Sequence, residues 1–361
     1  MTRGLPDHLY RILDLARWAP SGDNTQPWRF EVLGDEHLLV HGFDTRVHVV
    51  YDLDGHASQL AVGALLETLV IAATTQGRRC EILRREDTPE THTLFDVLFI
   101  QDASVPVDPL AGCIQTRVVQ RRPMSTRPLS DEQKAQLSAV LAEGHQVVWL
   151  ERLARRWQMA RFLFANAKVR LTIPEAYEVH KAVIEWGARF SEDKIPEQAV
   201  GVDAMTARFM RWAMSSWRRV HFFNTYLLGH LLPRIQLDLL PGVFCAGHFA
   251  LQASGKLESV DDFVAAGRVM QRFWLKAAQL GLLIQPEMTP VIFTRYWRSK
   301  RVFTSTPRAY GQIDKLNRQF AGVLRQASVD GVFFLGRVGT GPIPRARSTR
   351  RSVEALLYRG A

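Results

Sequence analysis

Two long apolar segments in distant parts of the chain resemble each other. SQLAVGALLETLVIAATTQG (residues 58–77) aligns without gaps on DFVAAGRVMQRFWLKAAQLG (residues 262–281), with two alanines and two glycines at matching places. Each segment predicts a buried helix that ends at a glycine. An interior glycine weakens a helix by about 1 kcal/mol relative to alanine, so Gly63 and Gly267 indicate close helix–helix approach. The repeat predicts two related lobes, with chance similarity of two buried helices as the alternative.

The remaining patterns predict an α+β fold. Strand-like runs occur at 29–33, 38–40, 94–100, 147–150, 243–251 and 331–335, without the regular alternation of a parallel sheet. Helices are predicted at 155–171, 174–190 and 204–228. We expect a first lobe at 1–112, a second lobe that starts at 113–154 and resumes at 236–361, and a helical insertion at 155–235. The aromatic and methionine-rich insertion could be a lid over a ligand, simple core, or a membrane-facing surface.

The charge pattern favours small anions over nucleic acid. The net charge is +10, but arginines gather in short clusters and no lysine run or aromatic-spaced RNA motif occurs. Arginine forks match phosphate oxygens, so discrete phosphate sites are expected. The eleven histidines and three cysteines show no metal-ligand spacing, and no nucleophile motif is present, so we predict no metal and no covalent catalytic residue. The N-terminus has no apolar leader, which predicts a soluble cytoplasmic protein without a membrane partner.

The segment RWAPSGDNTQPWRF (residues 17–30) places five turn-forming residues between an apolar run and Trp-Arg-Phe. Such a turn can present backbone groups, together with the side chains of Asn24 and Gln26, to a flat ligand. Pro27 and Trp28 would then lead into a strand that buries the far side of the turn. A turn beneath a tryptophan core anchor is the plainer interpretation.

These motifs resemble those of the nitroreductase superfamily of FMN-dependent oxidoreductases. APSGDNTQPWRF resembles its flavin-flanking segment Pro-Ser-x-x-Asn-x-Gln-Pro-Trp, and TRVVQRRPM resembles its phosphate-contacting segment, although Val119 stands where a serine is usual. GLLIQPEMTP (residues 281–290) and the stretch 336–356 resemble the segments near the flavin edge and at the end of the fold. The resemblance implies a set of FMN-binding residues: Pro20, Ser21, Gly22, Asn24, Gln26, Arg117, Arg121, Glu287, Met288, Arg350 and Arg351.

Ordinary members are homodimers in which both chains contribute to each flavin site. This chain carries one part of the site early and the others late, so it resembles the tandem, single-chain relatives, including the Acg-type proteins and the nitroreductase-like modules labelled as molybdopterin-biosynthesis proteins. The resemblance implies a pseudo-dimer, possibly monomeric, with one FMN site. We expect NAD(P)H-driven ping-pong reduction of an aromatic or conjugated acceptor, with both substrates sharing one flavin face. The alternatives are a flavin-binding protein with an occluded site and a non-flavin interaction module.

Overall fold

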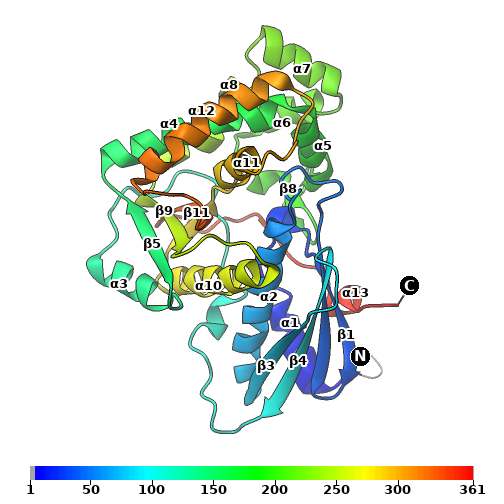
Figure 1. The fold of residues 1–361 in the computed structure, drawn as a ribbon. Coiled ribbons are helices and arrows are strands. Elements are labelled where there is room, and N and C mark those ends of the chain that lie inside the picture. The colour runs from blue at the N-terminus through cyan, green and yellow to red at the C-terminus, as the bar shows by residue number, and fades with distance from the viewer. Residues whose placement is uncertain (1–4, 361) are drawn as a thin grey trace.

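The computed structural model describes residues 5–360 as two four-stranded antiparallel sheets with helices around them (Figure 1). Residues 1–4 and 361 lie outside the described residues, so the expectation about a leader segment falls partly outside them. The first sheet has the order β1-β2-β4-β3 and the second has the order β10-β11-β9-β5. The α+β class predicted from the sequence is confirmed.

The strands of the two sheets correspond one to one. The first sheet contains β1 (Trp28–Gly34), β2 (His37–Phe43), β3 (Arg78–Arg85) and β4 (His92–Gln101). The second contains β5 (His145–Leu150), β9 (Gly247–Ala253), β10 (Leu283–Pro286) and β11 (Val332–Gly339). When β5, β9, β10 and β11 are matched in chain order to β1 to β4, the neighbour relations are the same. A long helix lies between the second and third strand of each set, and these are the two segments of the sequence repeat.

These two helices, α2 (His56–Thr74) and α10 (Val260–Gln279), pack against each other at the centre of the molecule (Figure 1). A β-carbon on Gly63 would lie 2.0 Å from the carbonyl oxygen of Val264, and one on Gly267 would lie 2.2 Å from that of Leu60. Their α-carbons can therefore approach closely only because neither residue has a side chain. The composition and length of α2 would suit a membrane span, but most of the helix is buried inside the protein, between α10, α1 and the first sheet.

Polar groups fix the register of the seam. The buried carboxylate of Glu67 on α2 accepts from Arg268 at 2.8 Å and from Arg272 at 2.7 Å, both on α10. The amide of Gln271 donates to the Thr68 hydroxyl at 2.9 Å. Buried polar groups that are paired in this way make a sliding of one helix along the other costly, because it would leave them unsatisfied.

The largest difference between the lobes is the length of the connection between their first two strands. β1 and β2 are joined by a two-residue turn, whereas β5 and β9 are joined by residues 151–246. This segment contains α4 (Leu153–Thr172), α5 (Pro174–Val183), α6 (Ala204–Ala213), α7 (Trp217–Tyr226), α8 (Leu231–Arg234), a π-helical turn (Ile235–Leu239) and α9 (Leu240–Val243). The short strands β6 (Ile184–Glu185), β7 (Phe190–Ser191) and β8 (Ile195–Pro196) lie among them.

Two helices of this segment are shorter than predicted. The helix expected at 174–190 ends at Val183, because Ile184 turns into an extended bridge with Ile195 and Gly187 adopts a φ of +79°. The helix expected at 204–228 is interrupted after Ala213, where Ser216 has an extended backbone and begins α7. Both helices end where the backbone becomes extended, and the periodicity of the sequence does not indicate these positions.

A helical pair between β10 and β11 was not predicted. It consists of α11 (Thr289–Arg298) and α12 (Pro307–Leu324), which pack on α4 through Phe162, Phe293 and Phe320. The remaining elements are α1 (Asp7–Ala16), α3 (Asp131–Ala139), β12 (Arg347–Ser348), α13 (Val353–Leu356) and the short helical turns Gly22–Asn24, Ala111–Cys113 and Glu197–Ala199. The second lobe thus carries helical additions at two of its strand connections.

The glycine contact predicts opposite effects for two alanine substitutions. Gly63→Ala places a methyl group against a backbone carbonyl that no rotamer change can move, so it should destabilise the fold by about 3 kcal/mol or more. Gly311→Ala, on an exposed stretch of α12 with open space at the β-carbon position, should stabilise it by about 0.5–1 kcal/mol. Urea unfolding of both variants measures the effects, and a neutral Gly63→Ala would contradict the close seam.

Candidate functional site

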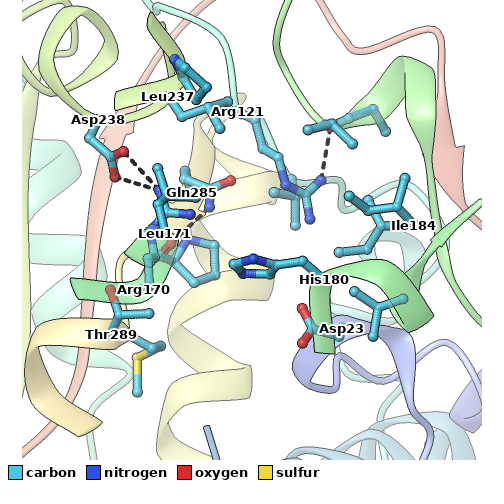
Figure 2. Close-up of a pocket in the computed structure, with 18 of the residues that line it drawn as sticks. Asp23, Arg121, Arg170, Leu171, His180, Ile184, Leu237, Asp238, Gln285 and Thr289 are labelled. Carbon is cyan, nitrogen blue, oxygen red and sulfur yellow. Dashed lines mark hydrogen bonds and ion pairs between the residues drawn. The ribbon is translucent and has the colours of Figure 1, made fainter. Parts of the chain in front are cut away.

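A large cavity of about 1020 Å³ lies between the two lobes and the helical segment (Figure 2). Its floor includes Leu60 and Ala61 of α2 and Met270 and Trp274 of α10. One wall comes from the turn after α1, from residues 117–121 and from residues 346–350, and the other comes from α5 to α8. Cavities that bind small molecules usually have volumes of about 300–1,000 Å³, so this one has room for a cofactor and a second small molecule.

The turn expected to face a flat ligand is strained. Asp23, Asn24 and Gln26 have positive φ angles of 49°, 64° and 49°. Non-glycine residues rarely adopt this conformation, and clusters of such strain occur at functional sites. The hydroxyl of Ser21 accepts from the backbone N–H of Gln26 at 3.0 Å, which closes the turn. Pro20, Ser21, Gly22 and Asn24 all line the cavity.

The amide side chains of the turn hold it to other segments. Asn24 Nδ2 donates to the carbonyl oxygens of Glu192 at 3.1 Å and Thr349 at 3.3 Å. Gln26 Nε2 donates to Glu192 at 2.8 Å, and its Oε1 accepts from the backbone N–H of Arg351 at 3.0 Å. Gln26 does not line the cavity, so its role is to position the turn. Asn24 Oδ1 is buried without a hydrogen-bond partner among the described residues.

Three arginines with no carboxylate partner gather behind the turn. Arg117 Nη2 donates to the carbonyl of Trp18 at 3.2 Å, and Arg350 Nε donates to that of Ala19 at 3.0 Å. Burial, followed by repulsion from Arg347, lowers the pKa of Arg350 to about 9. Burial and repulsion from Arg350 and Arg347 lower the pKa of Arg117 well below its usual value. Within the described residues 5–360, none of the three forms an ion pair, and Nε of Arg117 and of Arg347 lacks a partner.

The other two predicted arginines lie outside this cluster. Arg121 lines the cavity and donates to the carbonyl of Ala199 at 3.1 Å. Burial lowers the pKa of Arg121 to about 10, with Asp23 opposing this shift and Arg337 adding to it. Arg351 does not line the cavity and pairs with Asp193 at 2.9 Å. Of the four arginines implied by the resemblance, Arg117 and Arg350 lie in this cluster, whose third member, Arg347, was not among the predicted residues.

A second polar group occupies the cavity wall and was not predicted. Arg170 donates to both oxygens of Asp238, at 2.9 and 2.7 Å, and His180 Nε2 lies 2.8 Å from the Tyr51 hydroxyl. Burial and the positive charge of Arg170 lower the pKa of His180 to about 3, so this imidazole is neutral. Burial raises the pKa of Asp23. Figure 2 shows Asp23, Arg121 and His180 around the same part of the cavity.

Glu287 lines the cavity, but both of its carboxylate oxygens are used inside the protein. They bind Nδ1 of His248 at 2.7 Å and Nη1 of Arg337 at 2.9 Å, and its backbone N–H donates to Leu335 at 2.7 Å. Burial opposes charge on His248, but the adjacent Glu287 and Cys245 together raise the pKa of His248 to about 10. Met288 also lines the cavity, as does Val119, whose backbone bridges to Ile284.

Comparison with known proteins supports the resemblance seen in the motifs. Residues 6–62, which include α1, the strained turn and the start of α2, match the model of the Nitroreductase family. This match supports the nitroreductase superfamily as the family that the chain resembles. The chain is also 22% identical over 357 residues to the uncharacterized protein MT1398 of Mycobacterium tuberculosis, strain CDC 1551 / Oshkosh. That match covers 94% of this chain and 46% of the relative, so the chain spans less than half of the relative's length.

The Glu287 network predicts a pH-dependent loss of stability. Glu287→Gln leaves two buried cations without a carboxylate and should lower the free energy of unfolding by about 3–5 kcal/mol near pH 6. The folded-state pKa of His248 is raised from 6.5 to about 10, so its contribution is complete below 6.5 and is lost as the pH approaches 10. The difference in unfolding free energy between wild type and Glu287→Gln should therefore become smaller as the pH rises from 6.5 to about 10.

Urea unfolding at several pH values measures this difference. Glu258→Gln serves as the control, because Glu258 is an exposed partner of Lys256 and its removal should cost less than about 1 kcal/mol. A Glu287→Gln variant as stable as this control would show that the buried carboxylate does not hold the site together.

Proposed function

We propose that the chain is an FMN-dependent oxidoreductase that uses NAD(P)H to reduce an aromatic or conjugated small molecule. The observation that carries the proposal is the group of three arginines without carboxylate partners on the wall of a large cavity, beside a strained turn. Buried cations that repel one another are unfavourable alone, and an anion between them reverses the sign of the interaction. A phosphate is the anion that arginine forks match best.

The residues present fit an FMN molecule. Arg117, Arg347 and Arg350 would hold its phosphate, and the unpartnered Nε groups of Arg117 and Arg347 supply free donors. They can take over from the hydroxyl that Val119 does not provide. The unpartnered Asn24 Oδ1, on a residue that lines the cavity, is an acceptor suited to a flavin N–H group. The arginine cluster and Asn24 therefore lie on the same wall of the cavity, which is formed by the turn and by residues 117–121 and 346–350.

When bound, FMN supplies the exchange of electrons between a nicotinamide and an acceptor. The protein holds and orients the reactants and excludes water. Both substrates would use the same cavity in turn, which is the basis for ping-pong kinetics. The acceptor also takes up protons, and Asp23, which lines the cavity and whose pKa is raised by burial, would be a donor for them.

A flavin-binding protein with an occluded site is the second candidate. It is favoured by the helices α5 to α8, which cover the cavity on the side opposite the turn. Addition of NADPH to the flavin-loaded protein under nitrogen distinguishes the two. Rapid loss of the flavin absorption at about 450 nm supports the oxidoreductase, and an unchanged spectrum supports occlusion.

We expect about one FMN per chain, because the second lobe lacks the Asn-x-Gln-Pro-Trp segment. Denaturation of the purified protein and quantitation of the released flavin by chromatography test this ratio. Near two flavins per chain would show that both lobes bind, and a colourless protein that takes up no added FMN would exclude both candidate functions.

The arginine cluster predicts a preference for FMN over riboflavin. Arg350→Gln should weaken FMN binding at least tenfold, because a charge-assisted hydrogen bond contributes about 1.5–3 kcal/mol, and should change riboflavin affinity much less. Arg351→Gln removes the same charge from a side chain outside the cavity and is the matched control, with an expected change of less than about threefold.

Fluorescence titration with both flavins measures these affinities. Since Arg350 also binds the carbonyl of Ala19, Arg347→Gln is a second variant that leaves that contact intact. Arg121→Gln should affect the two flavins alike, because Arg121 lies near Asp23 and not in the cluster. Equal losses of FMN and riboflavin in Arg350→Gln and Arg347→Gln would place the phosphate elsewhere.

A further inference from the structure

The helices α6, α7 and α8 carry an exposed apolar surface. Tyr226 is 71% exposed and Leu228 is 58% exposed, and neighbouring aromatic and aliphatic side chains are also open to solvent. We call this surface the α6–α8 face; its exposed apolar members are Met205, Phe209, Trp212, Phe222, Tyr226, Leu227, Leu228, Leu231 and Leu232. Contiguous apolar side chains of this kind on a protein surface mark sites of interaction with a partner or a membrane.

The charged residues of the same segment are all basic. Between Asp203 and Asp238 the sequence has five arginines and no acidic residue. Four of the arginines are exposed and, in the part of the chain that the structure describes, form no ion pair: Arg208, Arg211, Arg218 and Arg219. Arg219 lies over the ring of Trp212, with its guanidinium carbon 4.9 Å from the ring centre. Cationic and aromatic side chains therefore share one surface.

This face projects from the rest of the molecule. No residue of α7 is buried, and Figure 1 shows α7 at the outer end of the molecule, away from the first sheet. A helix with apolar and basic side chains on a side open to solvent has the composition of an interfacial helix, which rests in the headgroup region of a bilayer.

The cavity extends to the same face. Phe209, Leu227, Leu228, Leu231 and Leu232 line the cavity and are also exposed to solvent. These residues therefore form an apolar rim, through which an apolar molecule can pass between the cavity and whatever covers the face. Under the proposed function, such a molecule would be a lipophilic conjugated acceptor.

In place of the sequence-based expectation of no membrane partner, we propose that the α6–α8 face binds the surface of an anionic lipid bilayer. Charge decides between this partner and a second copy of the chain. Two copies meeting through this face would bring eight exposed arginine side chains together without acidic partners, which is repulsive. An anionic headgroup layer matches the arginines, and the acyl boundary matches the aromatic and leucine side chains. The binding itself depends on neither FMN nor turnover.

Sedimentation with vesicles tests the proposal on the full chain. We expect the protein to pellet with vesicles that contain phosphatidylglycerol and not with vesicles of phosphatidylcholine alone, and the bound fraction should fall as salt rises. Arg218→Gln/Arg219→Gln should lower the partition coefficient roughly 25-fold, since each arginine near an anionic surface contributes about a fivefold gain. Phe222→Ser/Tyr226→Ser should lower it at unchanged charge.

The matched control is Arg11→Gln/Arg79→Gln, which removes two exposed charges from α1 and β3 on the first lobe (Figure 1). It should change the partition less than about twofold, and circular dichroism checks that all variants are folded. Equal losses in both arginine pairs would show an effect of net charge alone and overturn the proposal. So would an absence of pelleting with anionic vesicles, including the case in which the same face instead forms a dimer in solution.

Discussion

The close contact between α2 and α10 is the constraint on which the rest of the structure depends. Gly63 and Gly267 allow the backbones to touch, and the buried Glu67 pairs with Arg268 and Arg272 to set the register. The start of α2 and the second half of α10 form part of the cavity floor, so the separation of these two helices helps to set the width of the site. A wider seam would move the turn on one lobe away from the residues that the second lobe contributes.

The candidate site contains backbone strain and repulsion between charges, and the rest of the fold holds both in place. Three residues of one turn have strained backbones, and three arginines repel one another behind it. Hydrogen bonds from Asn24 and Gln26 to the segments near Glu192 and Thr349 hold this arrangement in place. Local strain that is maintained by distant parts of the chain is typical of a binding site whose ligand supplies the missing partners.

The sequence predicted those features that follow from local patterns. The helix repeat, the strands β1, β2, β4, β5 and β11, and the turn before Trp28 all have regular apolar spacing or turn chemistry. β3 was missed because Leu83 is exposed while Arg78 and Arg84 lie on the inward side, so the apolar alternation is broken. Glycine spacing also indicated the seam correctly, since only a close approach explains a glycine within each apolar helix.

The relative positions of the side chains in the candidate site could not be predicted from local patterns. The four predicted arginines come from segments that line or adjoin the cavity, but the path of residues 346–351 sends Arg350 inward and Arg351 outward to Asp193. Arg347 lies in β12, a strand of two residues that no sequence pattern predicted. His180 and Tyr51 come from segments far apart in the sequence, and only the fold of the inserted helices places them together.

The segment between β5 and β9 has a consequence for how such a molecule can diverge. In an assembly of two identical chains, every insertion is present twice, and an added set of helices must be tolerated on both sides of the axis. When the two halves are joined in one polypeptide, each half accumulates changes alone. Here a two-residue hairpin persists in one half while its counterpart has expanded to residues 151–246. Covalent linkage thus releases the fold from its symmetry, and one half can specialise while the other keeps the shared framework.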